Sequence, residues 1–430
     1  FFWLGDTWWM GLTKRLSWPK GFQALAADRV QKGFTVVQIV AGLYPDMPAF
    51  DARGANEAGF PWEKDYRRIK PAYFDLADRR IQHLVGKGLA PCIVGCWGYF
   101  LPWMGVEKMK KHWRNLVARY GSYPVTWCLA GEGTMPYYLS SNKEADAEFQ
   151  KKGWTEVAAY VRKIDPYRRP ITIHPCISAR LSVEDPSVVD FDMLQTGHGD
   201  RGSLPNTVKR VNEAYRTTPS MPVVEGEVCY EGIGEFCRPE VQRMMFWACI
   251  LNGAGGFTYG ANGIWQVNTR KKPYGPSPHG MTWGNTPWED ACHLPGSEHL
   301  GIAKRILARY PWWQFEPHPE WVAPGWTDDL FDLQFTCGRH DAPMAAGIPG
   351  KIRIIYLPMG TGLKMVKGLE KGVRYQARIF NPVTGDKQER GKIQPDASGN
   401  WVPRFSGYPS PALFPFPIFQ DWLLVLYTTS

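Results

Sequence analysis

Two segments of the chain place carboxylates directly after apolar, β-forming runs. Glu132 follows Val125–Ala130 and has a glycine on either side. The segment Met221–Glu231 offers Glu225 and Glu227 after a similar run. A carboxylic acid and a carboxylate can together hydrolyse a glycosidic bond, because one protonates the leaving oxygen while the other attacks the anomeric carbon. In the retaining form of this reaction the two carboxyl groups lie about 5 to 5.5 Å apart.

Residue types alone do not decide which glutamate of the second segment belongs to the carboxylate pair. Glu225 and Glu227 are two positions apart and would face the same side of a continuous strand. For Glu132 the alternative is a carboxylate that caps or salt-bridges a loop, but its flanking glycines would let the backbone pass close to a ligand. We therefore expect Glu132 in the pair, with Glu225 or Glu227 as its partner.

Two histidines stand near the ends of other predicted strands. His174 follows Ile171–Ile173 and could orient a carboxylate, although a lone histidine more often packs in a core. His198 lies between glycines after Met193–Gln195, a setting that favours a role in a site. Neither belongs to an HExxH or comparable spacing, so no metal site is predicted. The absence of a G-x-S-x-G elbow, a P-loop and a dinucleotide fingerprint predicts that no cofactor is used.

The elements that must position these residues follow an α/β pattern. Short β-forming runs alternate with amphipathic helical stretches, which is typical of repeated βα units. Eight runs favour a closed (β/α)8 TIM barrel over an open sheet, with the chemistry at the carboxyl ends of its strands. The predicted strands are Phe1–Leu4, Thr35–Val40, Ala90–Gly95, Val125–Ala130, Ile171–Ile173, Met193–Gln195, Pro222–Glu225 and Gly256–Tyr259. The predicted helices include Ala72–Val85, Val106–Tyr120, Ala145–Ile164 and Pro239–Leu251.

A second domain is predicted after the barrel. Beyond about residue 330 the helical period disappears, and turn signals separate short strand-like runs. These runs are Ile352–Leu357, Arg374–Phe380 and Trp422–Tyr427. We therefore predict a catalytic barrel over residues 1–329 and a C-terminal all-β sandwich domain over residues 330–430.

The aromatic content and the net charge of the chain indicate which classes of molecule the protein could bind. The chain contains 20 Trp, 19 Tyr and 21 Phe, whose flat faces fill cores and also stack on sugar rings. The net charge of +9 would suit an acidic substrate such as a pectic polymer, or nucleic acid. Because the basic residues are dispersed and no arginine-rich helix is present, we expect no nucleic-acid partner.

The remaining composition signals concern compartment and assembly. Nine cysteines are scattered without a CxxC pair, so mostly free, buried thiols are expected. No apolar run reaches the roughly 18 residues of a membrane span, so no membrane association is expected. The chain begins inside a predicted strand, and a removed signal peptide would make the protein periplasmic or secreted. The residues favour no particular oligomeric state.

Several segments taken together resemble one family. The motifs resemble those of the apiosidase-like group related to glycoside hydrolase family 140, and they run through the whole predicted barrel in order. They are Phe2–Trp9, Trp127–Glu132, Gln195–His198, Gly226–Glu231, Phe257–Gly260 and Ile264–Gln266. Proteins of that group also carry a C-terminal β domain named for collagen binding, and Phe380–Gly385 resembles its turn. The name alone is no basis for predicting collagen binding.

The resemblance implies a retaining mechanism with an acid/base after the fourth strand and a nucleophile after the seventh. It maps these roles to Glu132 and Glu227, although the group often has Asp at the position of Glu132. Other conspicuous motif positions, together with His174, are candidate substrate-binding residues, with a structural role as the alternative for each. They are Asp6, Trp9, His174, His198, Tyr230, Glu231, Tyr259, Asn262 and Trp265.

The implied function is that of a retaining, exo-acting glycosidase with a carbohydrate substrate from plant-derived, pectic glycans. A β-D-apiosidase is the first candidate specificity. Another sugar specificity or an endo-acting cleft, with the same mechanism, is the alternative within this class. A noncatalytic carbohydrate-binding protein on a degenerate barrel is the hypothesis from a different class.

Overall fold

The computed structural model describes residues 1–326, 342–358, 363–403 and 418–428. The chain forms two compact units. The first unit comprises residues 1–196, 217–236 and 256–294, and the second comprises residues 197–216, 237–255 and 295–430. The boundary predicted between residues 329 and 330 lies outside the described residues.

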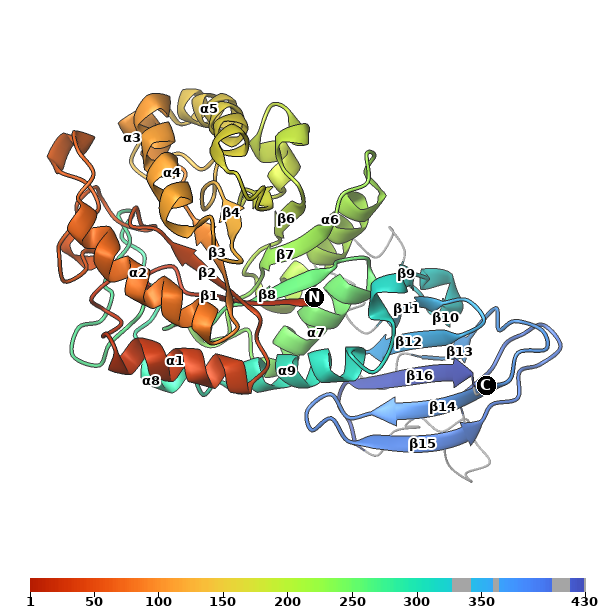
Figure 1. The fold of residues 1–430 in the computed structure, drawn as a ribbon. Coiled ribbons are helices and arrows are strands. Elements are labelled where there is room, and N and C mark those ends of the chain that lie inside the picture. Colours follow the sequence, from red (N-terminus) through yellow and green to blue (C-terminus); the bar gives the residue numbers. More distant parts are fainter. Residues whose placement is uncertain (327–341, 359–362, 404–417, 429–430) are drawn as a thin grey trace. The chain divides into compact units, whose positions relative to one another are not determined.

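The first unit holds an eight-stranded parallel sheet (Figure 1). Its strands are β1 (Trp3–Thr7), β2 (Val36–Val40), β3 (Ala90–Val94), β4 (Thr126–Cys128), β5 (Ile171–Thr172), β6 (Asp192–Gln195), β7 (Val223–Glu227) and β8 (Gly256–Tyr259). They follow the order β5-β4-β3-β2-β1-β8-β7-β6. Between the two end strands, the amide of Asp190 donates to the carbonyl of Ile171 at 2.8 Å. The sheet is thus a nearly closed barrel, and the predicted (β/α)8 TIM barrel followed by a β domain is confirmed.

Helices alternate with these strands along the chain, as the sequence predicts. The first unit contains α1 (Lys20–Gln31), α2 (Pro71–Gly86), α3 (Phe100–Met104), α4 (Val106–Tyr120), α5 (Lys143–Ile164) and α8 (Trp288–Ala291). The second unit contains α6 (Leu204–Arg216), α7 (Pro239–Leu251) and α9 (Pro295–Leu307). No described helix is both long and apolar enough to cross a membrane.

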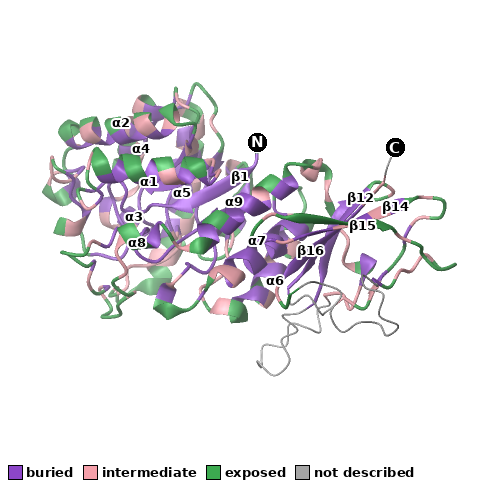
Figure 2. Ribbon diagram, turned by 90° about the horizontal axis from the view of Figure 1, so that it is seen from below, coloured by how far each residue is buried: buried purple, intermediate pink, exposed green. Residues whose placement is uncertain are grey.

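The barrel strands are buried almost throughout (Figure 2). Parallel strands covered on both faces read as continuous apolar runs, which is why they stand out in the sequence. Two strands extend further into polar residues than the sequence predicts. β1 continues to Thr7 and so includes Asp6, and β7 continues to Glu227. Both carboxylates therefore belong to strands rather than to the loops that follow them.

The second unit contains an antiparallel β domain. Its larger sheet has the order β15-β14-β16-β12-β11-β9, and β10 pairs with β13 in a small second sheet. The strands are β9 (Glu316–Pro317), β10 (Val322–Ala323), β11 (Met344–Ile348), β12 (Ile352–Leu357), β13 (Met365–Val366), β14 (Tyr375–Phe380), β15 (Lys387–Lys392) and β16 (Trp422–Thr428). One core joins both sheets, including Val322, Ile355, Val366 and Leu424.

The cysteines behave as the sequence suggests in the described part of the chain. Eight are free, and all of these are buried except Cys176, which is exposed. The ninth, Cys337, lies outside the described residues.

A buried ion pair joins helix and sheet inside the second unit. Arg243 on α7 donates to both carboxylate oxygens of Asp421 at 2.7 and 2.8 Å. Tyr356 on β12 donates to the same carboxylate at 3.0 Å. The ring of His299 lies 2.8 Å from Arg243, and burial together with the Arg243 charge lowers the pKa of His299 to about 4. The imidazole is therefore neutral and able to accept a bond from the guanidinium.

Substituting Asp421→Asn should destabilise the second unit by about 3 kcal/mol, because the Arg243 guanidinium is then buried without a counter-charge. Urea unfolding followed by circular dichroism measures the loss. The control is Glu298→Gln, which breaks an exposed ion pair with Arg305 and should change stability by less than about 0.5 kcal/mol. Equal effects of the two variants would contradict the assignment.

Candidate active site

Two carboxylates from different strands meet at the carboxyl end of the barrel. Glu132 follows β4, and Glu227 is the last residue of β7. The pKa of Glu132 is raised, first by burial and next by the negative charge of Glu227. The two side chains are thus close enough for their charges to interact. This pair has the residue types that acid-assisted glycosidic hydrolysis requires.

Glu132 is held in one orientation by two side-chain donors. Trp97 donates its indole N–H to Oε2 at 3.1 Å, and Gln195 donates its amide to Oε1 at 3.2 Å. Both bonds favour the charged form and oppose the shift caused by burial and Glu227. The backbone of Glu132 has a φ of +41°. Left-handed backbone is unusual for a residue with a side chain, and such strain gathers at functional sites.

Glu227 has a different set of neighbours. It is 5% exposed, and Nε2 of His174 lies 3.1 Å from its Oε2. Trp9 donates its indole N–H to the hydroxyl of Tyr230 at 3.0 Å, and that hydroxyl also bonds to Glu227. Since Tyr230 accepts from Trp9, its own proton can point to Glu227. Glu227 is therefore surrounded by groups that stabilise a carboxylate.

His174 lies between the two glutamates, although a lone histidine more often packs in a core. It is fully buried, and the backbone N–H of Glu132 approaches its Nδ1 at 3.4 Å. A ring that accepts at Nδ1 carries its proton on Nε2, the nitrogen that faces Glu227. The rings of Trp9 and Trp97 contact the imidazole at centroid distances of 5.3 and 6.2 Å. This tautomer, inferred from the contacts, places an N–H beside the Glu227 carboxylate at 3.1 Å, without the geometry of a hydrogen bond between the two atoms.

Glu225 and Glu227 do not lie on a regularly paired strand, so the condition for their expected same-side placement is not met. Leu194 on β6 pairs with Glu225 and the next residue pairs with Glu227, so the register shifts at Gly226. A bulge of this kind breaks the alternation of side chains. Glu225 is fully buried and bonds to the side chain of Thr196. The bulge thus separates the surroundings of the two glutamates.

The glycines beside Glu132 make room for protein side chains. A Cβ added to Gly131 would lie 2.1 Å from the ring of Trp97, and one added to Gly133 would lie 2.3 Å from Ile173. Side chains of the barrel itself fill these spaces. The two glycines therefore allow tight packing around Glu132, whereas their positions in the sequence suggested the close approach of a ligand.

Two residues of this site are missed by reasoning from sequence, namely Trp97 and Gln195. Trp97 follows β3 in a Cys-Trp-Gly segment, and Gln195 ends β6. Their position at strand ends was the available signal, and Gln195 lies in one of the recognised motifs. Nothing in the sequence indicates that both donate to the same carboxylate.

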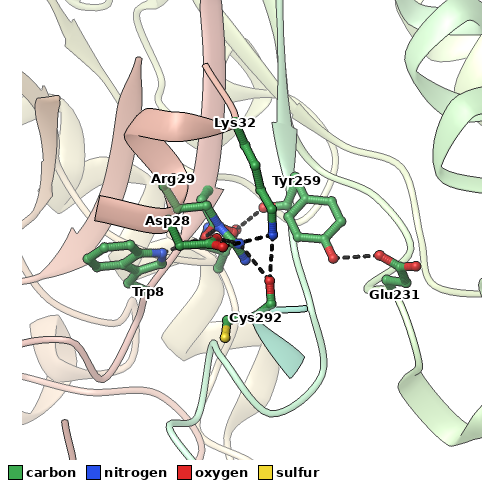
Figure 3. A network of polar contacts seen from close by, with 9 residues as sticks. Trp8, Asp28, Arg29, Lys32, Glu231, Tyr259 and Cys292 are labelled. Carbon is green, nitrogen blue, oxygen red and sulfur yellow. Dashed lines mark hydrogen bonds and ion pairs between the residues drawn. The ribbon is translucent and has the colours of Figure 1, made fainter. Parts of the chain in front are cut away.

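Asp6, Glu231 and Tyr259 lie in a buried polar network of the barrel. Asp6 accepts from Arg29 and from the indole of Trp8, each at 2.6 Å. Tyr259 donates to Glu231 at 2.5 Å. Arg29 also bonds to the Cys292 carbonyl at 3.2 Å, and Lys32 reaches the same oxygen at 2.7 Å (Figure 3). The network links β1, α1 and β8.

Asn262 and Trp265 belong to a tight loop after β8. Asn262 donates to the carbonyl of Trp283 at 2.5 Å and accepts from Gln266 at 3.0 Å. Trp265 stacks on Tyr230 with a centroid distance of 6.1 Å and an angle of 21°. This loop thus supports the tyrosine that bonds to Glu227.

The last predicted residue, His198, follows β6 and belongs to the second unit. Its backbone carbonyl accepts from the thiol of Cys237 at 3.8 Å. No group of three or more His, Cys, Asp or Glu residues that could hold a metal ion occurs within the described ranges.

Comparisons with solved structures show what this architecture resembles. A glycoside hydrolase matches with a TM-score of 0.74 and 20% identity, over 100% of this chain and 93% of that one. A glycoside hydrolase family 5 protein from Bacteroides vulgatus matches with a TM-score of 0.73 and 19% identity, over 100% and 89% of the two chains. A family 5 mannosidase from Rhizomucor miehei has a TM-score of 0.50 and 11% identity, over 72% and 94%. At these identities the likeness shows the fold.

A comparison of sequences identifies the family. No curated protein matches the chain. The family described as apiosidase-like, catalytic domain, matches residues 1–314, which include every strand of the barrel and both glutamates. The chain therefore belongs to the apiosidase-like glycoside hydrolases.

Proposed function

We propose that the protein hydrolyses glycosides with retention of the anomeric configuration, with Glu132 as acid/base and Glu227 as nucleophile. The observation that carries this proposal is the contrast between the two coupled carboxylates. Burial and the Glu227 charge raise the pKa of Glu132, which favours a proton there. Glu227 has His174 and Tyr230 as neighbours, which favours a charge there. One acid and one carboxylate are what the first step needs.

In the first step, Glu132 protonates the glycosidic oxygen while Glu227 attacks the anomeric carbon. The C–O bond to the leaving group breaks, and a glycosyl ester forms on Glu227. The positive charge that develops on the sugar is stabilised by the carboxylate as it approaches. Trp97 and Gln195 hold the Glu132 carboxyl group in place for proton transfer.

In the second step, Glu132 acts as a base. Ester formation removes the negative charge of Glu227, and with it one of the two causes that raise the pKa of Glu132. The pKa of Glu132 therefore falls in the intermediate, which favours the carboxylate form that takes a proton from water. The water attacks the anomeric carbon and frees Glu227, and the second inversion restores the original anomer.

For the substrate, we propose exo-acting hydrolysis of plant-derived, pectic glycosides, with a β-D-apioside as the first candidate. Family membership supports this specificity. A glycosidase with another sugar specificity or with endo action is the alternative. A noncatalytic sugar-binding barrel would bind glycosides without turnover, whereas the coupled acid and carboxylate favour an enzyme.

Replacing either member of the pair should abolish most turnover. We expect Glu132→Gln and Glu227→Gln each to lower kcat/KM by roughly 10²- to 10⁴-fold, because general acid and nucleophilic catalysis are lost. Glu225→Gln is the matched control, with a carboxylate two residues from Glu227. It should retain far more activity if it folds, which circular dichroism checks. A loss confined to Glu225→Gln would move the nucleophile to that residue.

The anomer released first tests retention. Proton NMR during hydrolysis of an aryl glycoside should show the substrate's own anomeric configuration before mutarotation sets in. Initial release of the opposite anomer would overturn the double-displacement mechanism. It would leave the carboxylates in the roles of acid and general base.

The pH profile tests the role of Glu132 as acid. Activity should fall as pH rises through the pKa of Glu132, since the first step needs its proton. Gln195 stabilises the carboxylate, so Gln195→Met should raise this pKa and move the falling limb of kcat/KM up by about 0.5 to 1 pH unit. Gln23→Met, at an exposed position on α1, should leave the profile unchanged. A downward shift for Gln195→Met would contradict the role.

A further inference from the structure

The chain that follows β7 pairs again with the chain that follows β8, beyond the ends of both strands. The backbone N–H of Glu231 donates to the carbonyl of Gly260, and that of Asn262 donates to the carbonyl of Glu231, each at 2.9 Å. Glu231 and Ala261 thus form a parallel bridge. The short stretch between Glu227, which ends β7, and this bridge is therefore held at both of its ends.

The side chain of Glu231 adds a buried bond to this pairing. Glu231 is only 1% exposed, and Tyr259 on β8 is fully buried. The Tyr259 hydroxyl donates to Oε2 of Glu231 at 2.5 Å (Figure 3). Burial, and next the charge of Glu231, raise the pKa of Tyr259, so the phenol keeps the proton that it donates. A hydrogen bond to a charged acceptor is stronger than one between neutral groups.

Tyr259 is also held by other parts of the barrel. Thr7 on β1 donates its hydroxyl to the carbonyl of Tyr259 at 3.2 Å, and the guanidinium of Arg29 lies 5.6 Å from the centroid of its ring. Glu231 and Tyr259 thus have partners within the protein and almost no surface that a sugar could contact. The sequence made both of them candidates for substrate binding, and the structure points to a different role.

Gly260 makes room for the ring of Tyr230. A Cβ added to Gly260 would lie 1.8 Å from Cδ1 of that ring, whereas carbon atoms in contact are about 3.5 to 4.0 Å apart. Trp265 stacks on the same ring with a centroid distance of 6.1 Å. The Gly260 backbone and the Trp265 indole therefore limit where the ring can lie. Its hydroxyl accepts from Trp9 and bonds to Glu227.

We call Glu231, Tyr259 and Gly260 together the Tyr230 seat. We infer that the Tyr230 seat consists of positioning residues, which hold the phenol so that its hydroxyl meets the Glu227 carboxylate. The inference rests on the proposed function, in which Glu227 is the nucleophile, and it adds three residues that act through Tyr230 without touching the substrate. Tyr230 directly precedes Glu231 and packs on Gly260, so a change in the seat displaces the ring. A displaced hydroxyl no longer stabilises the charged form of Glu227.

The pH dependence of kcat/KM tests the Tyr230 seat, because the first step needs Glu227 as a carboxylate. Activity should fall as pH drops through the titration of Glu227, and the loss of a hydrogen bond to the carboxylate moves this acidic limb to higher pH. We expect Tyr230→Phe and Gly260→Ala each to raise the limb by about 0.5 to 1 pH unit. In both variants kcat should fall roughly tenfold while KM changes less than about twofold, because the lost interaction acts in the transition state.

Combining the two variants shows whether Gly260 acts through Tyr230. Adding Gly260→Ala to Tyr230→Phe should move the acidic limb no further, because the hydroxyl that the glycine positions is already gone. The matched control is Gly86→Ala at the end of α2, where an added Cβ would meet no atom within 4 Å, and its profile should match that of the parent protein. An unmoved limb in Gly260→Ala, or an equal further shift in the double variant, would overturn the inference.

Tyr259→Phe tests the Tyr230 seat by a smaller change. It removes only the hydroxyl that donates to Glu231, so it decides the question if Gly260→Ala does not fold, which circular dichroism checks. We expect the acidic limb to rise by about 0.3 to 0.5 pH unit, and to rise no further when Tyr230→Phe is already present. Tyr167→Phe, at a position that is 55% exposed, is the control. An unmoved limb, or a higher KM with unchanged kcat, would contradict a positioning role for Tyr259.

A measurement without turnover separates this inference from the proposed function. In protein labelled with carbon-13 at the glutamate carboxyl groups, NMR follows each titration, and the signal of Glu227 is the one missing in Glu227→Gln. Its midpoint should rise in Gly260→Ala and in Tyr259→Phe, whether or not a glycoside is hydrolysed. An unchanged midpoint would overturn the inference, and turnover that is lost in Glu227→Gln would then still support the enzyme. A raised midpoint in a protein that hydrolyses no glycoside would support the Tyr230 seat and count against the proposed function alone.

Discussion

The structure depends on placing two like charges together in a buried position. Glu132 and Glu227 interact through their charges, and burial disfavours the ionised form of Glu132. Two carboxylates under these conditions do not share their charge equally unless their surroundings are equal. The barrel gives Glu227 the neighbours Tyr230 and His174, and it gives Glu132 one indole donor and one amide donor. Under the proposed mechanism, this difference in surroundings is what lets one carboxyl hold a proton.

That difference requires side chains from many separate strands. Trp97 comes from the end of β3, His174 from the end of β5, and Gln195 from β6. Their packing is tight enough that Gly131 has no space for a Cβ against Trp97. A barrel brings the carboxyl ends of all its strands to one rim, so residues far apart in the chain meet there. The fold is therefore the means by which long-range contacts tune Glu132.

The sequence predicts the fold well, and the surroundings of the two glutamates poorly. Buried parallel strands are continuous apolar runs, so the eight strands are visible without a structure. The bulge at Gly226 is not visible, because it is defined by the pairing of β7 with β6. The expectation that Glu225 and Glu227 face the same side holds for a continuous strand, and the pairing of β7 with β6 is not continuous there. Likewise, nothing local to His174 reveals that its ring lies between two glutamates.

The charged groups at the rim of the barrel also limit how far the net charge of the chain predicts its substrate. An excess of nine positive charges favours the approach of an acidic polymer, but such attraction is screened over about 8 to 10 Å in physiological salt. Recognition at contact distance depends instead on the groups nearest the bound molecule, and at the rim of the barrel these include the carboxyl groups of Glu132 and Glu227. The net charge therefore bears on how a charged polymer approaches the protein, and it does not decide which sugar the barrel rim holds.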